Sequence, residues 1–149
     1  MLRALLFLGL LLAPAAPASA QTFGVEWRRD LDFGDVWAGA TATVAPTSGS
    51  AAHWHVDARQ GDNVLLQFSL PAALTSGPNT VPVGFASDAA GWSRAPAAPS
   101  MTRFNPAQGT ATRGSPNGLY VWLGGTLSPP LGQAGGTYTA TITLIVTAN

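Results

Sequence analysis

The residues best suited to chemistry in this chain form the motif His53-x-His55-x-Asp57. Side chains two positions apart on a β-strand point to the same face, so the three would form one row of potential metal ligands. Zinc requires three or four ligands in a tetrahedral array, and one straight strand supplies no more than about two. The spacing equally fits the solvent-facing side of a strand whose other face carries Trp54 and Val56. We therefore expect neither a metal site nor a cofactor here.

No arrangement of nucleophile and base in the sequence indicates an enzyme. The chain contains neither the Gly-x-Ser-x-Gly elbow of serine hydrolases nor a His-Glu-x-x-His zinc motif. Asp30 and Asp32 would share a strand face, but Arg28 and Arg29 directly precede them, which favours local charge pairing. The chain has no cysteine, which excludes thiol nucleophiles, thiolate metal sites and thiol redox chemistry. We expect a non-enzymatic protein.

The five tryptophans are many for a chain of 149 residues, and they fall into two groups. Trp27, Trp54 and Trp122 occur in phase with apolar strand positions, which predicts core positions. Trp92 and Trp37 lie near turns, where an exposed aromatic ring can stack on a sugar. The alternative for a ring of this second group is packing against its own domain. Trp92, and more weakly Trp37, are the candidate platforms for a glycan.

Any of these candidate sites would be held in place by β-strands. The clearest strand pattern is at the C-terminus, between residues 136 and 149. Apolar side chains occupy every second position, and threonine dominates the positions between them. This alternation of β-branched residues predicts a strand with one apolar face that another layer covers. Ile145 is the one apolar side chain predicted on the opposite face. The apolar face contains Tyr138, Ala140, Ile142, Leu144 and Val146.

A second alternating strand follows residue 21, with Phe23, Val25 and Trp27 on its apolar face. Complete burial of these three side chains would contribute roughly 6 to 8 kcal/mol. Ordering about six backbone residues costs a similar amount, at roughly 1 to 2 kcal/mol each. Because the two terms nearly cancel, the strand needs sheet hydrogen bonds from its own domain or from the edge of a neighbouring molecule. The candidate strand-pairing residues are these three and, on the terminal strand, Tyr138, Ile142, Leu144 and Val146.

Between the two ends, turn signals recur at short intervals. No segment after residue 20 shows a 3.6-residue apolar repeat. Residues 119–123 are apolar on both faces, which predicts a central, covered strand, and Gly61-Asp62 predicts the turn of a β-hairpin. Residues 88–117 contain four prolines and show the weakest pattern, with a short strand expected around 101–104. The pattern predicts an all-β fold, an antiparallel β-sandwich of about seven or eight strands.

The first 20 residues predict a secretory signal peptide, removed on export. Arg3 provides positive charge, residues 4–13 form an apolar run, and residues 18–20 are a small-residue cleavage site. The alternative, an N-terminal membrane anchor, needs a longer apolar run, and no later stretch is long enough to be a transmembrane segment. Residues 21–149 then form a single domain, exported to the periplasm, the cell surface or the extracellular space.

Charge in the processed chain is sparse and nearly balanced. All seven basic residues are arginine, and Arg3 lies in the leader, so six face seven acidic residues and the net charge is −1. Such a surface attracts neither nucleic acid nor an anionic membrane. We therefore expect no nucleic-acid partner.

Three short motifs, in this order, resemble a known family. They are Leu31-Asp32-Phe33-Gly34 before a Gly-Ala-Thr strand, Leu123-Gly124-Gly125-Thr126-Leu127, and Gly136-Thr137-Tyr138-Thr139 leading into the terminal strand. Together they resemble the small secreted bacterial β-proteins known as domain of unknown function 4402. That family is similar to the pilin-like subunits of chaperone–usher fibres and to spore-coat U-type proteins. The resemblance covers most of the processed chain.

The resemblance implies an immunoglobulin-like, pilin-like sandwich that is completed by a strand from a chaperone or from the next subunit. Gly136 matches a glycine of such subunits, whereas Ala148 stands where they carry an aromatic residue, and their disulfide is missing. The implied function is a structural or assembly subunit whose partners are itself, a fimbrial-type chaperone or another subunit. Residues 23–27 would act as the donated strand. The alternative function is a glycan-binding, adhesin-like surface module.

Overall fold

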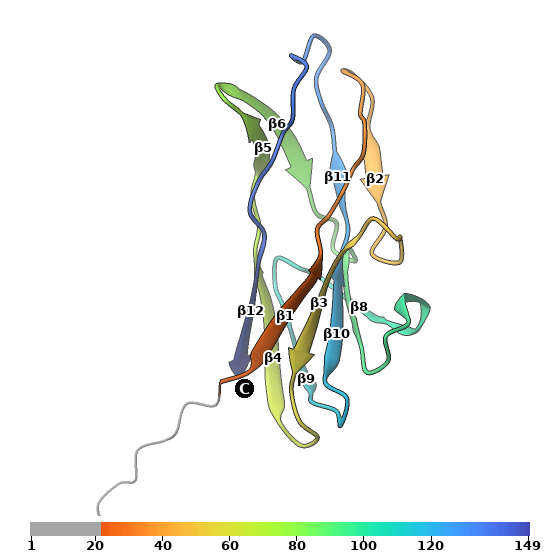
Figure 1. Ribbon diagram of the computed structural model, residues 1–149, viewed down its shortest axis with the longest axis vertical. Helices are drawn as coiled ribbons and strands as arrows, with labels where there is room; N and C mark the ends of the chain where they lie inside the picture. The colour runs from red at the N-terminus through yellow and green to blue at the C-terminus, as the bar shows by residue number, and fades with distance from the viewer. Residues whose placement is uncertain (1–21) are drawn as a thin grey trace, which may run out of the picture.

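The computed structural model describes residues 22–149, and the predicted signal peptide, residues 1–20, lies outside the described residues. The described chain is all β, with twelve strands and one short 3-10 helix (Figure 1). No helix within it is long and apolar enough to cross a membrane. The elements are β1 (Gly24–Arg29), β2 (Ala42–Val44), β3 (Ala52–Asp57), β4 (Asn63–Ser69), β5 (Ala73–Ser76), β6 (Asn79–Gly84), β7 (Ala90–Ser93), η1 (Ala98–Ser100), β8 (Thr102–Phe104), β9 (Thr110–Arg113), β10 (Leu119–Leu123), β11 (Gly125–Leu127) and β12 (Thr143–Ala148).

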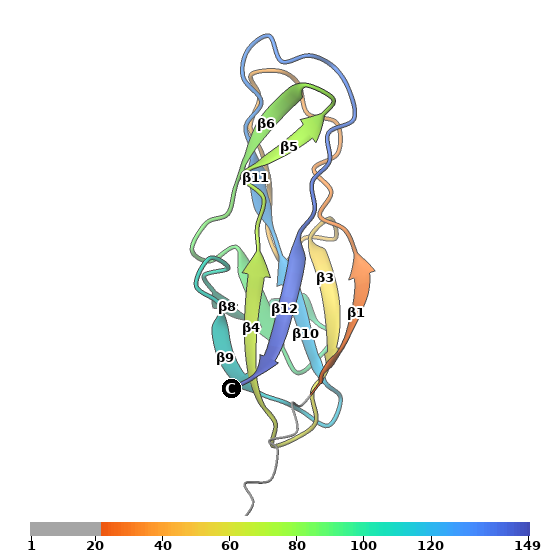
Figure 2. The same cartoon turned by 90° about the vertical axis from the view of Figure 1, so that its left-hand side faces the viewer.

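The strands form three antiparallel sheets, two of which face each other as a sandwich (Figure 2). One facing sheet has the strand order β1-β3-β10-β7-β8, and the other has the order β12-β4-β9. The third sheet, with the order β2-β11-β6-β5, extends the molecule upward in Figure 1, because β10 and β4 run on into β11 and β5 after short breaks. This arrangement confirms the all-β sandwich predicted from the sequence.

The core lies between the two facing sheets and is built from alternate residues of their central strands. Strand β10 lies between β3 and β7, and its outward-facing Trp122 is only 2% exposed. Residues 119–123 are thus covered on both faces, as their apolar pattern predicted. The inward side chains with 7% exposure or less include Trp54, Val56, Val64, Leu66, Leu119, Val121 and Leu123.

There are more strands than the seven or eight predicted, because bends split long runs into two. Gly124 interrupts residues 119–127, so β10 and β11 belong to different sheets. The Gly124 N–H donates to the carbonyl oxygen of Ala89 at 2.8 Å, and a side chain here would overlap the carbonyl oxygen of Val44. Strands β7 and β9 add two more from the weakly patterned stretch 88–117, where the expected strand around 101–104 is also present as β8.

The predicted β-hairpin at Gly61-Asp62 is wrong. Strand β3 pairs with β1 and β10, whereas β4 pairs with β12 and β9, so this turn carries the chain from one sheet to the other. The turn chemistry itself is present, because the Arg59 N–H donates to Asp62 Oδ2 at 2.7 Å and Gly61 has a φ of 97°. Turn residues specify that the chain reverses, but they do not specify whether the next strand pairs with the last one or faces it.

The terminal strand is shorter than predicted. Of the predicted strand, only the residues of β12 pair regularly with β4. Thr139 makes one isolated bridge to Thr75. Residues 140–142 between these two contacts belong to no strand. The predicted apolar face is therefore only partly covered.

Gly124→Ala should destabilise the sandwich, because the added methyl group would overlap backbone atoms that cannot rotate away. We expect the free energy of unfolding to fall by about 3 kcal/mol, the upper end of the range for overpacking. Urea denaturation followed by tryptophan fluorescence measures this change. Gly49→Ala is the control, because nothing lies within 4 Å of its added Cβ. Equal stability of the two variants would contradict the prediction.

Candidate functional site

The sandwich is open along one side, between β1 and β12. Each is the edge strand of its sheet, and no strand of the three-stranded sheet described in residues 22–149 lies in front of β1 (Figure 2). The chain segments 30–38 and 133–142, which continue from these strands toward the far end of the molecule, border the opening. A groove of about 870 Å³ lies between the two segments, and we call the segments its banks.

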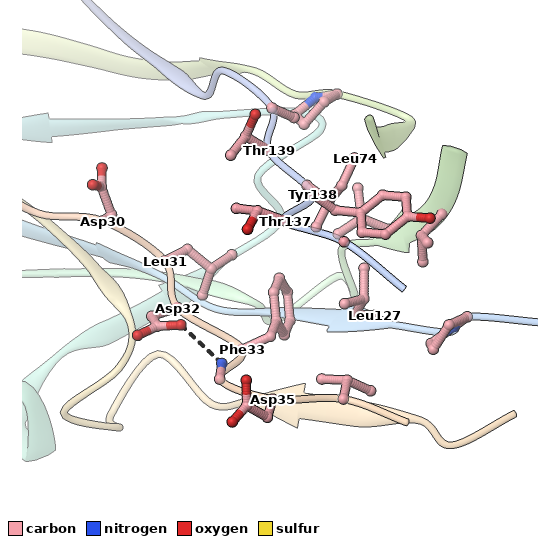
Figure 3. A pocket seen from close by; sticks show the side chains of 18 of the residues that line it. Asp30, Leu31, Asp32, Phe33, Asp35, Leu74, Leu127, Thr137, Tyr138 and Thr139 are labelled. Carbon is pink, nitrogen blue, oxygen red and sulfur yellow. Dashed lines mark hydrogen bonds between the residues drawn. The ribbon is translucent and has the colours of Figure 1, made fainter. Parts of the chain in front are cut away.

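The floor of the groove is apolar and incompletely covered. Leu31 and Phe33 from one bank and Tyr138 from the other are half-buried and extend toward Leu74 and Leu127 (Figure 3). Only Leu127 of these five is buried, at 7% exposure. A continuous apolar surface of this kind, bordered by polar residues, is typical of a site that another polypeptide covers.

Both banks also present unpaired backbone. The Asp32 N–H donates to the Ser50 carbonyl oxygen at 2.9 Å, and Thr139 exchanges two hydrogen bonds of 2.9 and 3.0 Å with Thr75. In an extended chain the neighbours of such residues direct their backbone groups to the opposite side. Across residues 22–149, no backbone hydrogen bond involves Leu31, Phe33, Tyr138 or Ala140. Unpaired edges of this kind are templates for strand pairing.

On the β1 side, the predicted apolar face is in phase with the core but is not covered by it. Val25 pairs with Val56 and Trp27 with Trp54, so both lie on the core face of the sheet. Val25 is nevertheless 42% exposed and Trp27 59% exposed, whereas Phe23 is buried at 8%. The prediction that Trp27 is a core residue is therefore wrong, because no strand of the opposite sheet faces this edge.

On the β12 side, Leu144 is buried at 8% exposure, and Ile142 and Val146 are half-buried against the same core. Ile145 points to the other face and is 42% exposed, as the alternation predicted. The candidate strand-pairing residues of the two chain ends thus lie on opposite sides of one opening. Sequence analysis did not place the bank 30–38 at this opening, because the alternation of residues 30–33 shows which side chains share a face but not which distant segment lies opposite.

The two candidate glycan platforms lie in different environments. Trp92 belongs to β7 and is half-buried against the core, with the guanidinium carbon of Arg94 5.4 Å from its ring centroid. The ring of Trp92 therefore packs against its own domain, which is the alternative that the sequence left open. Trp37 is 82% exposed, and Leu131 on another loop is 89% exposed.

The histidine motif lies on the outer face of the five-stranded sheet, away from the groove. The ring of His53 stacks on Trp122 with centroids 4.8 Å apart, and that of His55 lies 4.8 Å from Tyr120. His55 Nδ1 is 3.5 Å from a carboxylate oxygen of Asp57. Within residues 22–149, no group of three histidine, cysteine or acidic side chains could hold a metal ion. The two histidines of the motif thus pack against the aromatic rings of β10.

No protein-family model matches the chain, and a search of curated proteins finds no match. The resemblance to a known family therefore rests on the three sequence motifs. The structure brings all three to the groove, since residues 31–34 and 136–139 belong to opposite banks and the motif 123–127 ends at Leu127 in the floor.

The stability of the fold should decrease in mild acid through His53. Burial, followed by the positive charges of Arg29 and Arg28 and then of His55, lowers the pKa of His53 below its usual 6.5. The unfolded chain therefore binds this proton more readily, so the free energy of unfolding falls as the pH drops through 6.5 toward the lowered pKa. His53→Phe keeps a ring against Trp122 and removes the titration.

Urea denaturation between about pH 7.5 and 5 should show a weaker pH dependence for His53→Phe than for the unaltered protein. The same pH dependence in both would contradict the role of His53.

Proposed function

We propose that this protein is a secreted, non-enzymatic, pilin-like structural subunit that assembles by accepting a β-strand of another polypeptide along its open side. The observation that supports this most is the coincidence, along one groove, of half-covered apolar side chains and unpaired backbone groups. A strand that enters the groove buries the side chains and pairs with the backbone at the same time.

The energetics favour a strand that is already extended in a folded partner. Ordering a free peptide costs roughly 1 to 2 kcal/mol per residue, which offsets much of what burial and pairing contribute. An edge strand or a short arm of a folded protein has lost part of that freedom before it binds. The proposed partner is accordingly a second copy of this chain, a fimbrial-type chaperone or another subunit. Binding would take place in the periplasm, at the cell surface or outside the cell.

Ala140→Lys should block strand binding. Ala140 is exposed, lines the groove and has the same phase as Tyr138 and Ile142, so a lysine there places a charge in the path of the strand without removing a core contact. We expect binding of an alternating apolar peptide to weaken by about tenfold, equivalent to about 1.4 kcal/mol. Intrinsic fluorescence measures this, because Trp27 lines the groove.

The control is Thr141→Lys, which adds the same charge at the neighbouring exposed position on the other face of the chain. This variant should bind the peptide as the unaltered protein does. Sedimentation velocity of all three proteins tests self-association through the same groove. The proposal fails if the unaltered protein neither binds such peptides nor associates.

The exposure of Trp37 favours a second candidate function, a glycan-binding, adhesin-like surface module. Trp37 and Leu131 are the most exposed large apolar side chains among the described residues. Their loops are joined by a hydrogen bond of 2.9 Å from the Gly39 N–H to the carbonyl oxygen of Pro129. A fixed, exposed ring is what stacking on a sugar requires.

A glycan array distinguishes this candidate. Trp37→Ala should abolish any signal, because it removes the exposed ring, whereas Trp92→Phe should retain it, because that side chain packs on the core. An array without signal for the unaltered protein would exclude the glycan function.

A further inference from the structure

We infer that the groove selects a basic strand, one with apolar side chains at alternate positions and arginine or lysine at positions between them. The inference rests on the proposed function, because it specifies the chemistry of the strand that the groove accepts. Three acidic residues, Asp30, Asp32 and Asp35, lie along one bank. No arginine, lysine or histidine is among the described residues that line the groove.

The acidic side chains lie at the rim of the groove and not in its floor. Asp30 and Asp32 are exposed and alternate with the half-buried Leu31 and Phe33 (Figure 3). Directly opposed side chains on paired strands have Cβ atoms about 4.5 to 5.5 Å apart. In a strand paired with this bank, residues that point into the groove therefore meet the two apolar side chains. Residues that point outward lie beside the carboxylates.

The negative charge of this bank is not balanced within the described chain. Asp30 accepts a hydrogen bond from Trp27 Nε1 at 3.1 Å, and Asp32 accepts one from the Gly34 N–H at 2.8 Å. Both donors are neutral, and neither these carboxylates nor Asp35 takes part in an ion pair within residues 22–149. A cationic side chain of the partner would meet a carboxylate without having to displace an existing cation.

The two arginines that precede this bank make their printed contacts elsewhere, so the local charge pairing expected for Asp30 and Asp32 is not found among residues 22–149. The Arg28 guanidinium pairs with Glu26 at 2.7 Å, and Arg29 Nε donates to the carbonyl oxygen of Ala51 at 2.9 Å. The opposite bank presents exposed threonines between residues 137 and 141, which are neutral. Where the incoming strand lies beside Asp30 and Asp32, basic side chains that point out of the groove are thus favoured. Acidic side chains at the same positions are repelled.

The test uses the processed chain and three synthetic peptides of about ten residues, the length of one bank. All three carry valine at alternate positions, and the positions between hold lysine, glutamine or glutamate. Because each exposed charge pair changes the dissociation constant by about two- to fivefold, the lysine peptide should bind about tenfold more tightly than the glutamine peptide. The glutamate peptide should bind most weakly, and about 0.5 M salt should reduce the differences.

The triple variant D30N/D32N/D35N shows whether the bank is responsible. Asparagine keeps the side-chain oxygens that accept the hydrogen bonds from Trp27 and Gly34, so the bank retains its local contacts and loses only its charge. The preference for the lysine peptide should disappear, while the glutamine peptide binds as before.

The matched control is D57N/D62N/D88N, which removes the same charge from residues that do not line the groove and should leave the preference unchanged. Equal affinity of the unaltered protein for the three peptides would overturn this inference and leave the strand-accepting function intact. A preference that survives in D30N/D32N/D35N would also overturn it. Absence of binding by all three peptides would overturn the proposed function together with the inference.

Discussion

The structure depends on a mismatch in width between its two facing sheets. Five strands lie on one side of the core and three on the other, and β1 has no strand opposite it. Side chains on its core face have the correct phase for burial and still remain exposed, as Val25 and Trp27 do. The incompletely covered floor and the unpaired backbone of both banks occur along this same open side, where one further strand would complete the packing.

The fold separates this open side from the residues with the most familiar chemistry. On the outer face of the larger sheet, His53 stacks on Trp122 and His55 lies at a tilt against Tyr120. The groove instead offers apolar burial, backbone hydrogen bonding and carboxylate charge along an extended line. These features match the proposed binding of an extended strand, which needs apolar burial and backbone pairing along one line.

Patterns of two-residue period predicted the strands well, because alternation reports which side chains share a face. The prediction for residues 119–123 was confirmed, since these residues are covered on both faces. Trp27 and the Gly61-Asp62 turn were predicted wrongly for one common reason. Phase shows the face on which a side chain lies, and turn chemistry shows where the chain reverses, but neither shows which strand stands opposite.

The sequence by itself determined the all-β class, the strands at both ends and the side chains that share each face, because backbone sterics and side-chain alternation act over a few residues. Only the tertiary structure decided that residues 31–34, 123–127 and 136–139 meet at one groove, and that one bank of it is acidic. Such a meeting depends on which distant strands pair and on how many strands each sheet contains. Those choices are set by the packing of the whole core, to which every strand contributes at once.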